Sequence, residues 1–204
     1  MRIHSVAEQE RVDRRRAQIL SAASRVFARQ GFHRTTVREI AREAGIADAT
    51  VYLYFASKQE LLLAVLGELA RFGERPADFA ALAGVDMRAS LDTYLHQRFA
   101  DLRAWRQLFA AVFPEVLADS ELRAAQIAQA TPAFEAAEFE LARRMEAGEL
   151  SRRDPALLAR VAAATVIGLL VFDVMGDPVV DARWDELPTL LASLWSDGLG
   201  SEAR

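Results

Sequence analysis

Residues 36–58 read TVREIAREAGIADATVYLYFASK, and this stretch decides the fold. It opens with a capping box, in which the Thr36 hydroxyl and the Glu39 carboxylate each satisfy a free backbone N–H of a new helix. The helix ends at Gly45, which permits the positive φ that a tight turn needs. A second short helix is expected over residues 48–55. Two helices joined by so short a turn predict a helix-turn-helix motif, whose second helix fits the major groove of DNA.

The rest of the chain also shows helical periodicity, and no stretch alternates as a strand would. A helix over 12–30 is expected before the motif, and a second capping box at 57–60 opens a helix over 58–73. Further helices are expected over 86–103, 104–113, 119–147, 155–175 and 184–199. Pro114 is expected to end one of them, and Pro132 to kink or divide another. The sequence therefore predicts an all-α chain of about nine helices.

Composition excludes several classes of protein. The 204 residues contain no cysteine and only three scattered histidines, so no disulfide, cofactor or metal site is expected. No phosphate-binding glycine loop or nucleophile elbow is present, which argues against an enzyme. The longest uncharged apolar run, residues 161–172, is shorter than the roughly 20 residues of a membrane span. A cytoplasmic globular protein without a membrane partner is expected.

Charge is distributed unevenly along the chain. Residues 1–60 hold 11 Lys/Arg against 7 Asp/Glu, whereas residues 61–204 hold 14 against 22. This distribution favours a polyanion as the partner of the basic residues 1–60 and not of the acidic remainder. The alternative is chance variation over a charged surface.

Three segments carry a resemblance to a known family. They are FARQGF (27–32), TTVREIAREAGI (35–46) and TVYLYFxSKxELL (50–62). Over about residues 12–66 the chain resembles the N-terminal domain of the TetR family of bacterial transcription regulators. The resemblance implies a DNA-binding domain over 1–57, with helix 58–73 connecting it to an effector-binding and dimerisation domain over 58–204. It also implies a homodimeric repressor that binds a palindromic operator in double-stranded DNA and is released by a small molecule. The alternative is a DNA- or protein-binding module of the same fold without an effector.

The resemblance also implies which residues meet DNA: Thr36, Arg38, Asp48, Ala49, Thr50, Tyr52, Tyr54 and Lys58. Lys58, at a helix N-terminus, is expected to clamp a phosphate. Arg42 and the arginines at 14–16 are further candidates, with a solvated helix face as the alternative. One of the two tyrosines is expected to be core. Ala47 stands where the family usually has a serine or threonine cap, so Asp48 is the candidate replacement.

The second domain is expected to hold both an effector pocket and a dimer interface. Helix 155–175 is apolar on nearly every side, so one side must be covered by another surface. The side expected to face its own domain carries Leu158, Val161, Thr165, Leu169 and Phe172. The expected dimer interface comprises Ala164, Gly168, Val171, Met175, Leu187, Leu191, Leu194 and Trp195.

The candidate pocket residues are mostly aromatic and lie in the middle helices, with one hydroxyl from helix 155–175. They are Tyr94, Phe99, Trp105, Phe109, Phe113, Phe134 and Thr165. A pocket so lined favours a hydrophobic or amphipathic effector. The alternative for each aromatic residue is ordinary core packing.

Overall fold

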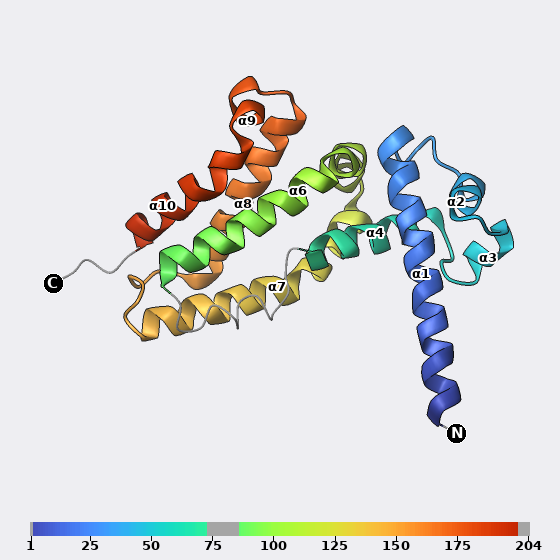
Figure 1. Ribbon diagram of the computed structural model, residues 1–204, viewed down its shortest axis with the longest axis horizontal. Coiled ribbons are helices and arrows are strands. Elements are labelled where there is room, and N and C mark those ends of the chain that lie inside the picture. The colour runs from blue at the N-terminus through green and yellow to red at the C-terminus, as the bar shows by residue number, and fades with distance from the viewer. Residues whose placement is uncertain (1, 73–85, 200–204) are drawn as a thin grey trace. The chain divides into compact units, whose positions relative to one another are not determined.

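A computed structural model gives the fold and describes residues 2–72 and 86–199 (Figure 1). Within these ranges the regular elements are nine α-helices and one 3-10 turn, η1 (Trp184–Glu186), and the all-α prediction is confirmed. The α-helices are α1 (Arg2–Gln30), α2 (Val37–Ala44), α3 (Asp48–Tyr52), α4 (Lys58–Phe72), α6 (Met87–Ala118), α7 (Ser120–Glu146), α8 (Pro155–Val174), α9 (Pro178–Ala182) and α10 (Leu187–Leu199).

The chain forms two compact units. Unit 1 comprises Met1–Leu69 and Gln107–Gln126, and unit 2 comprises Ala70–Arg106 and Ile127–Arg204. Helices α6 and α7 therefore each contribute to both units. Unit 1 contains the whole segment predicted to bind DNA.

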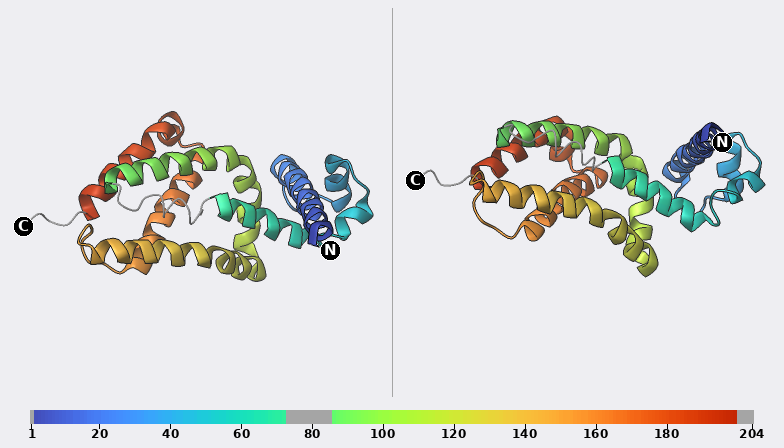
Figure 2. Two further views of the ribbon diagram at one scale, coloured as in Figure 1. Left: turned by 60° about the horizontal axis from the view of Figure 1, so that its bottom comes forward. Right: turned by 90° about the horizontal axis from the view of Figure 1, so that it is seen from below.

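The core of unit 1 is built on the C-terminal half of α1. Ile19, Val26 and Phe27 are fully buried there, and α2 and α3 lie together on one side of the helix in all three views (Figures 1 and 2). Helix α3 is anchored by Val51, and the chain after it by Phe55. Gly45 adopts the predicted positive φ after the end of α2, and Gly31 does the same after the end of α1.

Pro114 does not end its helix as expected, and Pro132 does not divide the helix that it was expected to kink or divide. Helix α6 continues through Pro114 to Ala118, so residues 104–113 are not a separate helix, and α7 continues through Pro132. Proline removes a single backbone hydrogen bond from a helix interior. In α6 that loss is offset because Val112 and Val116, on either side of Pro114, are buried and hold the last turn in place.

The segment before the last helix differs from the prediction. Helix α9 was not predicted, although Asp177 caps it and Pro178 occupies its first position, which is the signal that correctly predicted the start of α8. Trp184 belongs to η1 and not to the last helix, which begins at Leu187. Its buried indole packs 5.0 Å from the Phe99 ring and donates a hydrogen bond of 3.2 Å to the Phe99 carbonyl.

Helix α8 is long and apolar enough to cross a membrane, judged by length and composition alone. The sequence predicted no such helix, because the uncharged apolar run of residues 161–172 is too short to span a membrane. The helix contains Arg160 and Asp173, which pair with Glu138 at 2.7 Å and with Arg106 at 2.8 Å. These pairs tie α8 to α7 and α6 within unit 2.

Candidate nucleic-acid interface

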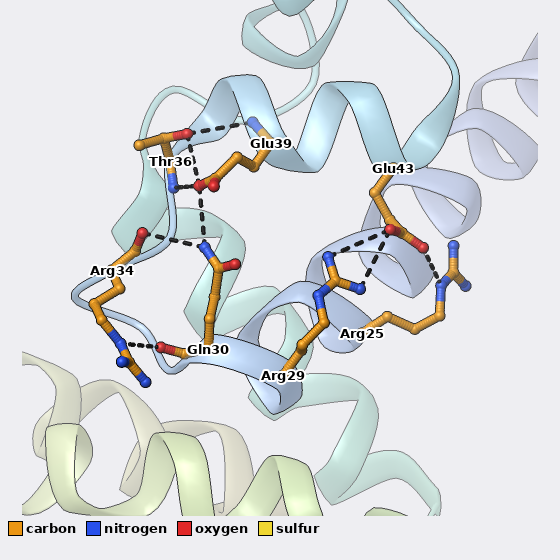
Figure 3. Close-up of polar contacts among 7 residues, drawn as sticks. All are labelled: Arg25, Arg29, Gln30, Arg34, Thr36, Glu39 and Glu43. Atoms are coloured by element: carbon orange, nitrogen blue, oxygen red, sulfur yellow. Dashed lines mark hydrogen bonds and ion pairs between the residues drawn. The ribbon is translucent and has the colours of Figure 1, made fainter.

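The start of α2 is fixed by the predicted capping box (Figure 3). The Glu39 backbone N–H donates to the Thr36 hydroxyl at 3.3 Å, and the Thr36 N–H donates to the Glu39 carboxylate at 2.8 Å. The backbone N–H of Thr36 is the main cause that holds the pKa of Glu39 below its ordinary value. The Thr36 hydroxyl also donates to this carboxylate, at 2.9 Å. Thr36 is exposed, but its hydroxyl proton serves the cap rather than an incoming phosphate.

Two arginines of α1 share one carboxylate of α2. Arg25 and Arg29 contact the Glu43 carboxylate at 2.8 and 3.5 Å, as Figure 3 shows. The hydrogen bond from Arg25 is the first cause that lowers the pKa of Glu43. These arginines join α1 to α2, so they are poor candidates for contacts with DNA.

Arg38 and Arg42 are arranged differently. Both are exposed on α2 and, with Glu39, Ile46 and Asp48, line a hollow at the surface of the motif. Within residues 2–72 and 86–199, Arg38 forms no hydrogen bond or ion pair. A cation without a protein partner beside the second helix of the motif suits contact with a phosphate.

Helix α3 presents most of its predicted contact residues to solvent. Asp48, Ala49 and Tyr52 are exposed, while Thr50 is half-buried. Ala47 gives no side-chain cap to the helix, as its departure from the family pattern implied.

The end of α3 contains one residue that the sequence analysis missed. Leu53 is 82% exposed and follows directly on Tyr52, which is 55% exposed. Tyr54 is half-buried, and its carbonyl accepts a 2.9 Å hydrogen bond from Arg16. In the sequence Leu53 directly follows the predicted contact residue Tyr52. It lies between Val51 and Phe55, which are the buried positions of this segment, so its exposure could have been predicted.

Lys58 requires a correction. Its ammonium donates to the carbonyls of Phe32 at 2.9 Å, His33 at 3.3 Å and Thr35 at 2.9 Å. A lysine has three N–H donors, so none remains for a phosphate. Burial lowers the pKa of Lys58, and the nearby negative charge of Glu115 opposes that shift. The side chain holds the α1–α2 connection in place, and the predicted phosphate clamp is not supported.

Lys58→Met is expected to destabilise the protein by about 1–3 kcal/mol, because three carbonyls lose their shared donor. Urea unfolding measures this effect. The control is Gln59→Met at the exposed neighbouring position, which is expected to change stability by less than about 0.5 kcal/mol. If Lys58→Met leaves stability unchanged and weakens binding equally on every DNA sequence, the prediction that Lys58 clamps a phosphate would be supported instead.

The candidate pocket residues do not form a single group. Phe109 and Phe113 stack at 4.4 Å in unit 1, whereas the other five lie in unit 2. Phe99 is buried against Trp184, so it belongs to the core. The Thr165 hydroxyl donates to a carbonyl of its own helix, that of Val161, at 2.9 Å.

The remaining pocket candidates are half-buried residues of unit 2. Arg160 lies 4.8 Å over the Phe134 ring, and Arg98 lies 5.6 Å over the Tyr94 ring. Trp105 is half-buried on α6. Unlike Phe99, these three rings are only partly buried.

Helix α8 buries a different side from the one expected. Its buried residues are Ala159, Val166, Leu170 and Asp173. Val161 and Phe172, predicted to face their own domain, are 52% and 53% exposed. A helix that is apolar all round gives no periodicity from which its inner side can be chosen.

An apolar stripe runs along one side of α8 to its C-cap. Its members are spaced three or four positions apart and so share one face. This "α8 stripe" comprises the exposed residues Leu157, Val161, Ala164, Phe172 and Met175 and the half-buried Gly168. Val171, predicted at the interface, is half-buried beside it.

Helix α10 adds further exposed apolar residues. Leu190 and Leu194 are 53% and 57% exposed, whereas Leu187 and Trp195 are half-buried. Leu191 is buried within the protomer, so it belongs to the core and not to the predicted interface.

Comparisons with known proteins agree with this architecture. The family model "Bacterial regulatory proteins, tetR family" matches residues 19–65. The fatty acid metabolism regulator protein of Bacillus subtilis is 44% identical over 59 residues, or 28% of this chain and 30% of that protein. The transcriptional activator FasR of Mycolicibacterium smegmatis is 32% identical over 162 residues, or 79% of this chain and 70% of FasR. The first three curated relatives are each matched over 27–52% of their length.

Solved structures cover nearly the whole chain. The fatty acid degradation regulator FadR of Bacillus halodurans is 26% identical, with a TM-score of 0.72 over 92% of this chain and 99% of that one. FadR of Bacillus subtilis in complex with stearoyl-CoA is 26% identical, with a TM-score of 0.66 and the same coverage. The motif, the fold and these relatives lead to one conclusion. The chain belongs to the TetR family of bacterial regulatory proteins, whose members are DNA-binding regulators and not enzymes.

Proposed function

We propose that the protein is a homodimeric cytoplasmic repressor that binds a palindromic operator and is released by an amphipathic effector of the acyl-CoA class. Residues 1–57 form its DNA-binding domain, and residues 58–204 bind the effector and the second subunit. The observation that carries the proposal is the exposed face of α3, with Arg38 beside it unpaired among the residues that the structure describes.

The exposed side chains of α3 supply the chemistry for reading bases. The Ala49 methyl fits against a thymine methyl, and Asp48 can accept a hydrogen bond from a cytosine amino group. Arg38 contributes a sequence-independent contact with phosphate. Thr36 is exposed at the start of α2, two positions before Arg38.

A second subunit supplies the cover that the α8 stripe lacks. Two copies related by a two-fold axis would bring the α8 stripe and the exposed leucines of α10 against the same surfaces of the partner. In such a dimer the two copies of α3 would bind successive major grooves, which lie about 34 Å, or one turn of DNA, apart. A palindromic operator follows from that symmetry.

The effector class rests on the relatives. A protein 26% identical to this chain, with a similar fold, has been solved in complex with stearoyl-CoA. The half-buried rings of Tyr94, Trp105 and Phe134 offer apolar surface to an acyl chain. The effector acts by favouring a conformation whose two α3 helices no longer match successive major grooves.

The test is a titration of the protein–DNA complex with stearoyl-CoA, followed by fluorescence anisotropy of a labelled duplex. Stearoyl-CoA is expected to weaken DNA binding by about 5- to 150-fold, and coenzyme A without the acyl chain is expected to have little effect. If neither compound changes DNA affinity or thermal stability, the acyl-CoA proposal fails. The protein would then be better described as a DNA- or protein-binding module of the same fold without an effector.

A further inference from the structure

Helix α1 extends well beyond the core of unit 1. Its 29 residues span about 44 Å, at 1.5 Å per residue. Among its described side chains Ile19 is the first that is buried, and residues 8–18 are exposed or half-buried. Figure 1 shows this N-terminal half projecting past α2 and α3. We call residues 8–18 the α1 arm.

The base of the α1 arm is attached to both helices of the motif. Arg16 donates to the Tyr54 carbonyl just after α3, at 2.9 Å, and its guanidinium lies 4.4 Å over the Phe55 ring. Gln18 donates to the carbonyl of Ala44, the last residue of α2, at 2.7 Å. The direction of the α1 arm is therefore fixed relative to the surface that reads DNA.

Three arginines occupy one face of the α1 arm. Arg14 and Arg15 lie three and four positions after Arg11, a spacing that places each of them on the same side of the helix as Arg11. Asp13 is two positions from Arg11 and Arg15, so it points to the other side. Gln18 continues the arginine face towards α2.

These arginines are not committed to strong pairs. Arg14 is exposed and has no ion-pair partner in the described part of the chain. Arg15 contacts only the neutral Gln18, at 2.8 Å. Arg11 pairs with Glu8 at the surface, where both side chains are mostly exposed. Such a surface pair contributes about 1 kcal/mol or less, so it can exchange for a phosphate.

We infer that the α1 arm binds backbone phosphates of the DNA that flanks each half-site, with Arg11, Arg14 and Arg15 as the contacting cations. This inference rests on the proposed DNA binding and extends it beyond the base pairs that α3 reaches. The α1 arm adds affinity and salt dependence but no base readout, because phosphates are the same at every position.

The test replaces Arg11, Arg14 and Arg15 together with glutamine, which removes the charges and preserves helix propensity. Binding is measured on two duplexes that contain the same selected site. The short duplex has about 20 base pairs and holds the two half-sites alone, and the long one has about 40 base pairs and adds flanking DNA on both sides. On the long duplex the variant is expected to lose roughly 5-fold in affinity for each phosphate contact, with a salt slope shallower by about 0.9 per contact. On the short duplex wild type and variant are expected to bind alike.

Two controls isolate the position of the charges. Replacing Arg88, Arg152 and Arg153, which are exposed in unit 2, with glutamine removes the same charge and is expected to leave both affinities unchanged. Lysine at the three positions of the α1 arm is expected to restore most of the lost affinity. If the wild type binds the site but shows no benefit from flanks, the inference is wrong. If the wild type binds no site on either duplex, the proposed DNA-binding function is contradicted.

Discussion

Replacing Gly168 with tryptophan is expected to convert the dimer into monomers without unfolding them. A Cβ added at Gly168 would meet no other part of its own protomer within 4 Å, so the backbone there accepts a side chain, and a partner packed on the α8 stripe would collide with the ring. Overpacking costs about 1–3 kcal/mol per site. A two-fold interface repeats the collision, giving roughly 2–6 kcal/mol and weakening association by about 30-fold to more than 10,000-fold.

Sedimentation velocity over a dilution series measures the effect, and thermal unfolding checks that the protomer remains folded. Ala100→Trp, at an exposed position of α6, adds the same ring outside the α8 stripe and is expected to leave the mass of the dimer unchanged. A Gly168→Trp protein that retains wild-type dimer mass at every dilution would place the interface elsewhere.

Arg106→Met is expected to destabilise unit 2 by about 3–5 kcal/mol. Asp173 is only 2% exposed on α8, and Arg106 contacts its carboxylate and its carbonyl, both at 2.8 Å. Methionine retains much of the aliphatic stem but leaves a buried carboxylate without its cation.

The same change at Arg103, one turn earlier on α6, is the matched control. Arg103 lies 3.9 Å from Asp185, which is 96% exposed, so Arg103→Met is expected to cost about 1 kcal/mol or less. Urea unfolding compares the two variants. Adding Asp173→Asn to Arg106→Met should recover part of the lost stability, because it removes the buried negative charge that has no cation. Equal, small losses at both arginines would show that the buried pair contributes little.

Local signals in the sequence were sufficient for the motif. The capping box of Thr36 and Glu39, the turn at Gly45 and the uncapped Ala47 are each governed by a few neighbouring residues. The structure reproduces all three. The helical fold followed in the same way from periodicity.

Features that depend on distant residues could not be predicted. Lys58 binds carbonyls 23–26 positions away, and no local pattern reveals that its donors are occupied. The buried side of α8 depends on which helices pack against it, because the helix is apolar all round. Pro114 did not end its helix because Val112 and Val116, on either side of it, are buried and hold the helix in place, which the local sequence does not reveal.

The most direct test of DNA recognition by a symmetric dimer is selection of binding sites from a random duplex pool at near-physiological salt. The predicted result is an inverted repeat whose half-sites are centred about one helical turn apart, since two α3 helices would occupy successive major grooves. Enrichment of a single, non-repeated site would contradict the dimeric arrangement. Failure to enrich any sequence from effector-free protein would contradict the claim that α3 reads an operator.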